Sequence, residues 1–558
     1  MVSRRKQLDL VWPAALCGAA LAIAATPGRT ASGPDSGAPS IAKKFYADDP
    51  VLREPAPRPV RKVETRQVDD IYDFLENMYV TPKREGREAK RNPLPAGNTN
   101  TWGDVPESPW YTNRHYVHRM SIEELQRGPG NTTPPDPNST WRITSAKSDG
   151  LMPGFVIEDS RKNRYMVKFD PPDYPELCSG PDVIGSKIFY ALGYNTPENY
   201  VVHFRRESLE IGDGVMYRDP NGKKHPLTSH VLDELLRSQS KAADGTYRAM
   251  ASRWISGKVV GPFSYEGTRS DDPNDIVPHQ DRRELRGLRV FAAWLNHQDT
   301  RSINSMDSLV TENGVPFLKH YLLDFGSILG SAGDGPKLPW YGHEYVIARK
   351  AAVMQMVTLG LYPPRWARSE YRDFTGVGML DYRSFDPVMW KPSYPNPAFL
   401  LTDREDAFWA AKQVAAFSDD EIRALVKTGE YSDPRATDWI AECLIKRRDK
   451  IADAAFAKVL PLDKFRVKDG EIGFDDLAAS RGSGTARLYE VRWAKYDQQS
   501  HFTPLPNNLG RKVPAIGDTE YLAATIGCAG DAEHSCPDPI TVYVRHSGTG
   551  LQVAGIDR

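Results

Sequence analysis

The order of hydrophobic and polar residues predicts strands first and helices later. Residues 141 to 170 (WRITSAKSDGLMPGFVIEDSRKNRYMVKFD) contain three short apolar runs separated by Gly, Pro or Asn turns, which is typical of strands. The next stretch, SGPDVIGSKIFYALGY, has apolar residues at helical spacing, with Pro181 in the first turn and Gly193 at the end. ENYVVHF is typical of another strand. The predicted order is therefore three strands, a helix and a strand.

Helical patterns dominate the middle of the chain. In RRELRGLRVFAAWLN, apolar residues recur every three or four positions, so we expect a helix that ends just before His297. REDAFWAAKQVAAF, SDDEIRALV and RATDWIAECLIKRRDKIADAAFAKVL have the same period. After about Pro461 the chain changes to turn-rich, strand-like segments such as YEVRWAKY and DPITVYVRH, which predicts a separate small β domain.

The N-terminal residues have the pattern of an export signal. A basic start, an apolar run and the small-x-small triplet Ala22-Ile23-Ala24 indicate a secretory signal peptide over residues 1 to 24. The Arg4-Arg5 pair also partly resembles a twin-arginine signal, so Sec and Tat export both stay open. No later segment approaches the ~18 apolar residues of a membrane span. We expect an exported protein, periplasmic or extracellular, without a transmembrane helix.

Two segments precede the first predicted strand. Residues 25 to 59 are rich in Pro, Gly, Ala and Ser, which predicts a flexible linker. Residues 60 to 140 combine a short amphipathic helix (VDDIYDFLENMYV) with Trp102, Trp110 and Tyr111. Because such aromatic residues more often form a packing surface than a ligand site, we expect this extension to brace the domain that follows.

Cysteine spacing leaves two interpretations near the C-terminus. Removal of the signal peptide would leave four cysteines, of which Cys528 and Cys536 could close a small loop in an oxidising compartment. His534 lies between them, but two thiolates and one imidazole are short of a closed zinc site. We favour the disulfide and keep zinc as the alternative.

Charge and missing motifs exclude several classes of function. Lys and Arg number 72 against 73 Asp and Glu, and no basic stripe is concentrated enough for a phosphate backbone, so nucleic acid is not the expected partner. The sequence has no G-x-x-x-x-G-K-[ST], H-E-x-x-H or G-x-S-x-G motif. Clustered Asp and Arg residues between 261 and 287 are expected to form a solvated loop, with a role in substrate recognition or in linking the two lobes as the alternative.

The most informative stretch is residues 297 to 327, HQDTRSINSMDSLVTENGVPFLKHYLLDFGS. Two strand-like runs flank Asn313-Gly314, and Asn-Gly is the strongest short hairpin signal. Asn304 lies ten residues before Gly314 and Asp324 ten residues after it, so an antiparallel hairpin would return Asp324 beside Asn304. An amide and a carboxylate suit a hard divalent cation such as Mg²⁺, which keeps waters that nucleotide phosphates can replace.

This stretch resembles the catalytic loop and metal-binding turn of the protein-kinase-like superfamily. His297, Asp299 and Asn304 meet the family pattern H-x-D-x-x-x-x-N, and Asp324-Phe325-Gly326 supplies the DFG. The resemblance implies that Asp299 accepts or orients the proton of a substrate hydroxyl. It implies that Asn304 and Asp324 hold the metal ions.

Other residues gain expected roles from the same resemblance. Arg301 stands where many kinases have a phosphate-contacting lysine, and Asp307 is either a further metal ligand or a solvated loop carboxylate. Lys168, at the end of the third predicted strand, resembles the lysine that anchors the nucleotide; its alternative is an exposed strand lysine. Asp182 and Glu176 are both open as the acid that pairs with Lys168, and Asp182 is preferred.

The sequence also departs from the family pattern. In place of G-x-G-x-x-G it offers only Gly150 and Gly154, a turn whose backbone N–H groups could still reach nucleotide phosphates. Gln298 replaces the usual Arg before Asp299, and no A-P-E follows the DFG. With these departures the sequence resembles atypical members of the superfamily, in a bacterial branch. Such members include HipA-like, CotH-like, secretory-pathway and phosphoinositide kinases.

The resemblance implies an α+β, bilobal protein-kinase-like fold with a small antiparallel-sheet N-lobe and a mostly helical C-lobe. The expected parts are a signal peptide (1–24), a linker (25–59), an N-terminal extension bracing the N-lobe (60–140), the N-lobe (141–205), the C-lobe (206–460) and a C-terminal β-rich domain (461–558).

The implied function is a phosphotransferase. It would use ATP, or another nucleotide, with Mg²⁺ or Mn²⁺ to modify a hydroxyl of a protein, lipid, sugar or small molecule. Three alternatives stay open: a nucleotidyl (AMP) transferase, an inactive pseudokinase that serves as an exported binding or scaffold module, and a structural β-rich surface protein in which DFG is accidental.

Overall fold

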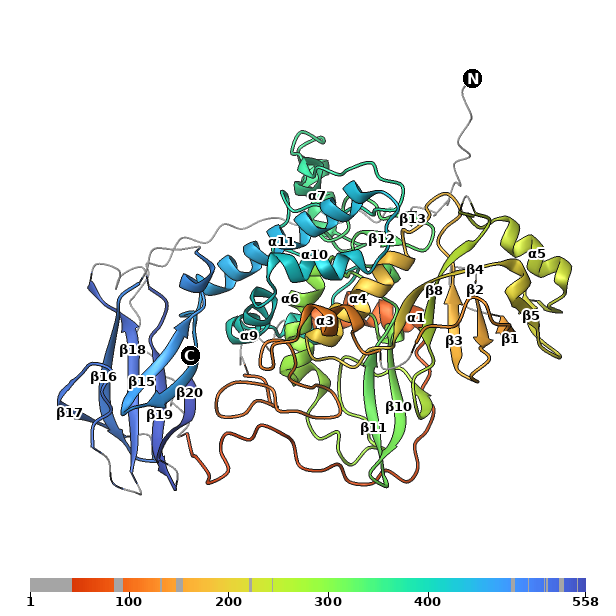
Figure 1. Cartoon of the computed structure of the whole chain (residues 1–558). Helices are drawn as coiled ribbons and strands as arrows, with labels where there is room; N and C mark the ends of the chain where they lie inside the picture. The colour runs from red at the N-terminus through yellow and green to blue at the C-terminus, as the bar shows by residue number, and fades with distance from the viewer. Residues whose placement is uncertain are drawn as a thin grey trace.

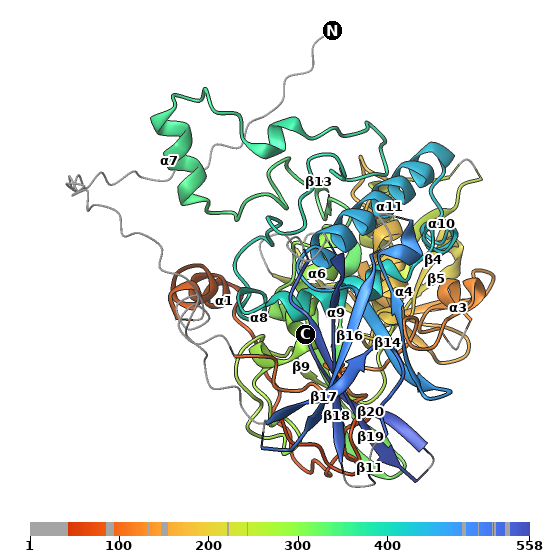
Figure 2. The same cartoon turned by 90° about the vertical axis from the view of Figure 1, so that its left-hand side faces the viewer.

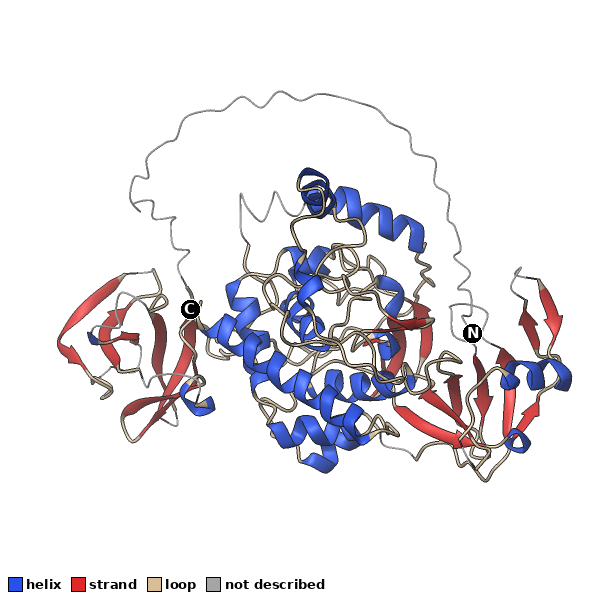
Figure 3. Ribbon diagram, turned by 90° about the horizontal axis from the view of Figure 1, so that it is seen from above, coloured by secondary structure: helices blue, strands red, loops and turns tan. Residues whose placement is uncertain are grey.

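The computed structural model has mixed α and β content, as expected (Figure 1). It describes residues 43–84, 94–130, 133–146, 154–219, 223–242, 244–482, 487–499, 501–515, 517, 520–530, 536–548 and 550–558. The predicted signal peptide, the first part of the predicted linker, Gly150 and His534 lie outside these ranges. Seen from above, strands lie at both ends of the molecule and helices lie between them (Figure 3).

The predicted order of strands and helix is confirmed in the first sheet. Its strand order is β4-β8-β3-β2-β1-β5, and all neighbours are antiparallel except β1 and β5. Helix α4 connects β3 to β4. The bounds are β1 (Trp141–Ala146), β2 (Gly154–Glu158), β3 (Arg164–Lys168), α4 (Ser179–Ala191), β4 (Asn199–Phe204), β5 (Leu209–Ile211) and β8 (Tyr247–Arg253).

The first sheet extends beyond residue 205, where the sequence placed the end of the N-lobe. Strand β8 lies between β3 and β4, so residues up to Arg253 belong to the same sheet. The chain between β4 and β8 also contains elements that the sequence analysis did not predict. They are β5, β6 (Met216–Arg218), β7 (Lys224–Pro226) and α5 (Ser229–Arg237).

The predicted helices of the middle region are confirmed. Helix α6 ends at Leu295, just before His297, and it is buried along almost its whole length. The predicted helices are α6 (Arg283–Leu295), α9 (Arg404–Ala415), α10 (Asp419–Lys427) and α11 (Pro434–Phe456); α7 (Arg349–Val357) and α8 (Pro397–Leu400) were not predicted. Among the described helices, none is both long and apolar enough to cross a membrane.

The predicted hairpin is confirmed between β10 (Ser305–Glu312) and β11 (Val315–Leu322). Glu312 pairs with Val315, and the two turn residues Asn313 and Gly314 have φ of 50° and 79°. This left-handed backbone is the one that Asn and Gly adopt most readily. Strand β9 (Lys258–Gly261) extends the hairpin to three strands.

The contacts of the N-terminal extension reach beyond the sheet that follows it in the sequence. The ring of Trp110 stacks on His320 of β11, with centroids 3.5 Å apart. The hydroxyl of Tyr111 donates to Gln413 of α9 at 2.8 Å, and Trp102 Nε1 donates to the carbonyl of Val553 at 3.2 Å. The three aromatic residues therefore anchor the extension to the hairpin, to the helices and to the C-terminal strands.

Strands begin again at Leu462, close to the change of pattern at Pro461. A hairpin precedes a five-stranded sheet of order β17-β16-β18-β19-β20, which faces the viewer in Figure 2. Cys528 and Cys536 form the favoured disulfide. The strands are β14 (Leu462–Lys468), β15 (Glu471–Asp476), β16 (Tyr489–Tyr496), β17 (Phe502–Leu509), β18 (Tyr521–Cys528), β19 (Ile540–Ser547) and β20 (Gly550–Asp557).

Candidate active site

Lys168, Asp182 and Asp324 meet although they lie far apart in the sequence. Lys168 Nζ donates to Asp324 Oδ1 at 2.9 Å and lies 3.8 Å from Asp182 Oδ2. Burial opposes the charge on Lys168, but the two carboxylates outweigh it and hold the lysine pKa above its usual range. The third strand, helix α4 and the DFG turn thus converge on one charged cluster.

Asp182, rather than Glu176, is the acid beside Lys168. The Asp182 side chain is buried in the first turn of α4, and its Oδ1 accepts from Asn199 at 2.8 Å and from the backbone N–H of Phe325 at 3.2 Å. Glu176 instead accepts from the backbone N–H of Ser432 at 3.0 Å. Asp182 therefore connects the lysine to the DFG turn.

Gly154 lies directly beside the charged cluster. It begins β2 and pairs with Lys168 across the β2–β3 ladder. A Cβ on Gly154 would lie 2.3 Å from the carbonyl oxygen of Val167, so a side chain has no room there. Strand packing alone accounts for this glycine, and its contact with nucleotide phosphates stays a prediction.

The hairpin returns Asp324 beside Asn304, as the spacing predicts. Leu323 donates its backbone N–H to the Asn304 carbonyl at 2.9 Å, and Asn304 Nδ2 donates to the Asp299 carbonyl at 2.7 Å. The Oδ1 atom of Asn304 accepts no hydrogen bond from any residue that the structure describes, and the Asp324 side chain is 41% exposed. The partly exposed Asp324 carboxylate and the free Oδ1 of the buried Asn304 are oxygen donors of the kind that Mg²⁺ or Mn²⁺ binds, with waters or phosphates as further ligands.

In the part of the chain that the structure describes, His, Cys, Asp and Glu side chains do not gather into a metal site of their own. Within the described ranges there is no group of three His, Cys, Asp or Glu residues that could hold a metal ion. Asn304 and Asp324 would therefore depend on a nucleotide and water to complete the coordination of an ion.

Asp299 is ionised by its neighbours. Burial favours the neutral acid, but Arg301 and Lys337 outweigh burial and lower the pKa of Asp299. Arg301 Nη2 donates to Asp299 Oδ2 at 3.1 Å, and Arg301 Nε donates to Oδ1. The Asp299 carboxylate is thus charged and can accept the proton of a hydroxyl or orient that hydroxyl.

Arg301 is occupied by two carboxylates. Besides Asp299, its Nη1 donates to Asp70 Oδ2 at 3.0 Å. Asp70 belongs to α1 (Asp70–Leu75), the helix predicted in the N-terminal extension, and Asp73 of the same helix accepts from Tyr394 at 2.6 Å. The extension therefore lies against the loop that carries Asp299. Its Asp70 binds Arg301, the residue that was expected to contact phosphate.

Asp307 is neither beside the other predicted metal ligands nor solvated. Its side chain is 1% exposed; one oxygen accepts from Arg269 at 3.1 Å and the other contacts His320 Nδ1 at 2.7 Å. The loop that supplies Arg269 was predicted to be solvated, and that prediction is wrong. Arg269 and Arg282 are almost fully buried, and Asp275 contacts His279 at 2.7 Å. Asp307 and this loop form a buried ion network.

Lys337 is a site residue that the sequence analysis missed. It follows β13 (Gly335–Pro336), and its charge acts on Asp299. Its position thirteen residues after Asp324, at the end of the Gly-rich run SAGDGP, was the only available signal.

Helix α4 also fixes the DFG turn through apolar contacts. Phe325 stacks on Phe189 of α4 with ring centroids 5.0 Å apart. Gly185, one turn earlier, allows the close approach, because a Cβ there would lie 2.5 Å from Phe325 Cβ and 2.8 Å from Ile328 Cδ1.

Gly185→Ala should therefore lower both stability and turnover. Alanine gains about 1 kcal/mol of helix propensity over glycine, but overlap with Phe325 should give a net loss of about 1–3 kcal/mol. Displacing Phe325 also moves Asp324. Unfolding midpoints and nucleotide turnover would test the expectation, with Gly548→Ala as control because no atom lies within 4 Å of its added Cβ. A variant as stable and active as the control would contradict it.

His297 should make the protein sensitive to mild acid. Burial lowers its pKa from the ordinary 6.5 to about 4, although Asp299 opposes the shift. Between those values the unfolded chain binds more protons than the folded one, so stability falls as pH falls. Full protonation would cost on the order of 3 kcal/mol. Denaturant titrations from pH 7 to pH 4 should show that the free energy of unfolding falls as pH falls, and that it falls less steeply in His297→Gln. The same pH dependence in both proteins would refute the role given to His297.

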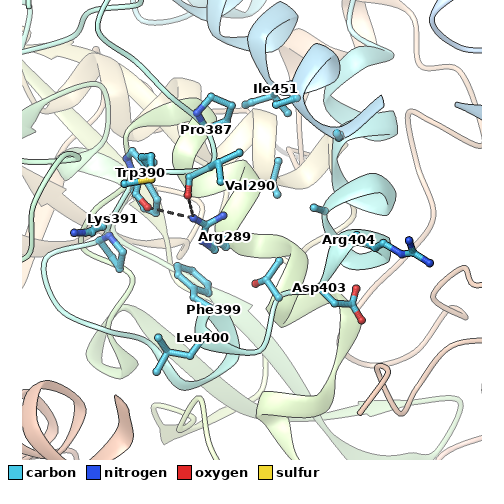
Figure 4. Close-up of a pocket in the computed structure, with 18 of the residues that line it drawn as sticks. Arg289, Val290, Pro387, Trp390, Lys391, Phe399, Leu400, Asp403, Arg404 and Ile451 are labelled. Carbon is cyan, nitrogen blue, oxygen red and sulfur yellow. Dashed lines mark hydrogen bonds between the residues drawn. The ribbon is translucent and has the colours of Figure 1, made fainter. Parts of the chain in front are cut away.

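A separate cavity of about 440 Å³ is lined by residues of α6, α8, α9 and α11 (Figure 4). Arg289 of α6 forms part of its wall and donates through Nη2 to the carbonyls of Val388 at 2.7 Å and Trp390 at 3.4 Å. Trp390 also donates to Asn296, the residue before His297, at 3.0 Å. None of the predicted site residues lines this cavity.

Comparison with known proteins gives little further information on the function of this site. No family model and no curated protein matches the chain. Two solved structures of the Golgi casein kinase are similar to it. The one with Mn/ADP bound is 10% identical over 60% of this chain and 73% of that chain, with a TM-score of 0.26. The other is 9% identical over 72% and 95%, also with a TM-score of 0.26. At such TM-scores the likeness carries no weight, so the function is argued from the site.

Proposed function

We propose that this protein is an exported, kinase-like phosphotransferase that moves phosphate from a metal-bound nucleotide, ATP or another, to a hydroxyl acceptor. The observation that carries the proposal is the contact of Lys168 with Asp182 and Asp324, at 3.8 and 2.9 Å. A lysine on the third strand, an acid on the next helix and a DFG aspartate are the parts that bind nucleotide phosphates and metal in kinases.

Each residue would have one task in this reaction. Lys168 would contact the nucleotide phosphates, and Asp182 would hold that lysine in place. Asn304 and Asp324 would hold Mg²⁺ or Mn²⁺, which when bound would neutralise charge on the phosphates. Asp299 would accept or orient the proton of the acceptor hydroxyl, for which its ionised state is suited.

The alternatives differ in what happens to the nucleotide. Lys168 bonded to Asp324, and Arg301 held by Asp70, would also suit a pseudokinase that binds a partner without turnover. A nucleotidyl transferase would use the same phosphate and metal contacts but transfer AMP. Neither alternative requires different residues, so only the product distinguishes them.

The deciding experiment is product analysis of the mature protein with ATP and Mg²⁺ or Mn²⁺. Release of ADP, or a mass gain of one phosphate, would support phosphotransfer, whereas a gain of AMP would show nucleotidyl transfer. Binding without turnover would favour the pseudokinase. Failure to bind ATP or another nucleotide would favour the structural interpretation. Export to the periplasm or beyond is part of the proposal, and the N-terminal sequence and location of the protein in cells would test it.

A further inference from the structure

Lys337 belongs to a segment that lies against the loop carrying Asp299: a Cβ added to Gly342, five residues after Lys337, would lie 3.4 Å from Gln298 Nε2. It comes directly after β13, and its backbone N–H donates to the Gly330 carbonyl at 2.8 Å. The residue is only 8% exposed. Its side chain approaches the ring of Tyr341, with Nζ 5.5 Å from the ring centroid.

The ammonium of Lys337 has no polar partner in the described part of the chain. Nζ forms no hydrogen bond or ion pair there, and the aromatic contact is long for a charged group. Because the residue is mostly buried, a negatively charged ligand at Nζ would interact with the ammonium with little screening by water.

Asp299 defines where such a ligand would lie. Asp299 and Lys337 are close enough to shift each other's pKa, but they form no ion pair. A phosphoryl group bound by Lys337 would lie near Asp299, as transfer to a hydroxyl oriented by Asp299 requires. Burial lowers the pKa of Lys337 to about 8, against the opposing effect of Asp299, and a bound phosphate would favour the charged form further.

The other cations near the catalytic loop are already engaged. Lys168 contacts Asp324 and Asp182, while Arg301 contacts Asp299 and Asp70. On the basis of the proposed function, we propose that Lys337 contacts the phosphoryl group during transfer, in the role that the sequence resemblance gives to Arg301.

The reaction balances without any further reactant. The acceptor oxygen forms a bond to the γ-phosphorus, and the bond between that phosphorus and the β,γ-bridging oxygen breaks. The bridging oxygen leaves with the electron pair as part of the nucleoside diphosphate, and Asp299 takes the hydroxyl proton. Lys337 balances negative charge on the oxygens of the moving group and exchanges no proton.

Lys337→Met should lower kcat by about 100-fold, the usual effect of removing one donor to a transition-state oxygen. ATP affinity should fall relative to ADP affinity, because ADP lacks the γ-phosphate, and ADP binding should stay near wild type. Lys337→Arg should restore part of kcat. Lys187→Met is the matched control, since burial lowers that lysine's pKa to about 8 as well, on α4 outside the cluster.

The outcomes separate this inference from the proposed function. Unchanged kcat and an unchanged ATP-to-ADP affinity ratio in Lys337→Met, beside an active wild type, would overturn the inference alone. If Lys337→Met loses as much affinity for ADP as for ATP and also loses thermal stability, Lys337 has a structural role and the inference is overturned too. If wild type binds ATP without turnover, loss of its preference for ATP over ADP in Lys337→Met still supports the contact. A wild type that binds neither nucleotide overturns both proposals.

Discussion

Asp324→Ala should abolish metal-dependent nucleotide turnover while the protein stays folded. The Asp324 carboxylate is 41% exposed and its partner Lys168 keeps Asp182, so the loss of stability should be about 1 kcal/mol or less. Without that oxygen ligand the metal cannot be held against the phosphates, and we expect turnover to fall at least ~1,000-fold. ADP release and intact mass, measured with Mg²⁺ and with Mn²⁺, would show the loss.

The matched control for Asp324→Ala is Asp213→Ala. Asp213 is a fully exposed aspartate that follows β5, the edge strand of the first sheet, and forms an ion pair with Arg142 at 2.8 Å. Loss of that pair should leave turnover unchanged. Full activity in a folded Asp324→Ala protein would remove the proposed metal site.

Asp299→Asn should separate nucleotide binding from turnover. An amide cannot take the hydroxyl proton, so the rate should fall by about 10²- to 10⁴-fold, the contribution usual for a general base. Binding of ATP with metal should persist, because Lys168, Asn304 and Asp324 are untouched. Calorimetric titration beside a turnover assay would measure both properties.

Asp386→Asn is the control for the change at Asp299. Arg365 outweighs burial and lowers the pKa of Asp386, so the variant also removes a charged partner of an arginine, but outside the site. Should Asp299→Asn and Asp386→Asn retain the same rate, Asp299 would have no role as a base.

Local signals in the sequence were enough to predict the hairpin and the residues at its base. Asn-Gly fixes the turn, and equal spacing on its two sides places Asn304 beside Asp324. The buried helices were predictable for the same reason, because the apolar period of α6 or α11 depends only on neighbouring residues. The resemblance also implied the pairing of Lys168 with Asp182, but the hydrogen bond from Lys168 to Asp324 was not predicted.

Contacts between distant segments were not predictable. Asp70 and Arg301 are 231 residues apart, and no local pattern relates them. Asp307 was predicted to be solvated or to bind metal. Its actual partner, Arg269, lies on a charged loop that the sequence predicted to be exposed, so the buried ion pair between them was not expected. Lys337 has no periodic context, and its burial depends on how the chain after the DFG packs against the catalytic loop.

The chain before β1, from the end of the predicted linker through the N-terminal extension, limits how short an expressed fragment of this protein can be. Phe45 packs among the rings of Tyr496, Tyr521 and Tyr543, and Ile556 donates its backbone N–H to the Thr101 carbonyl at 2.8 Å. A recombinant fragment that stopped at residue 460 would keep every proposed site residue but lose this attachment. The residues before the helix that carries Asp70 would then lose their contacts with the C-terminal strands. The contact between Asp70 and Arg301 would change with them, so activity measured on the fragment would not represent the full-length protein.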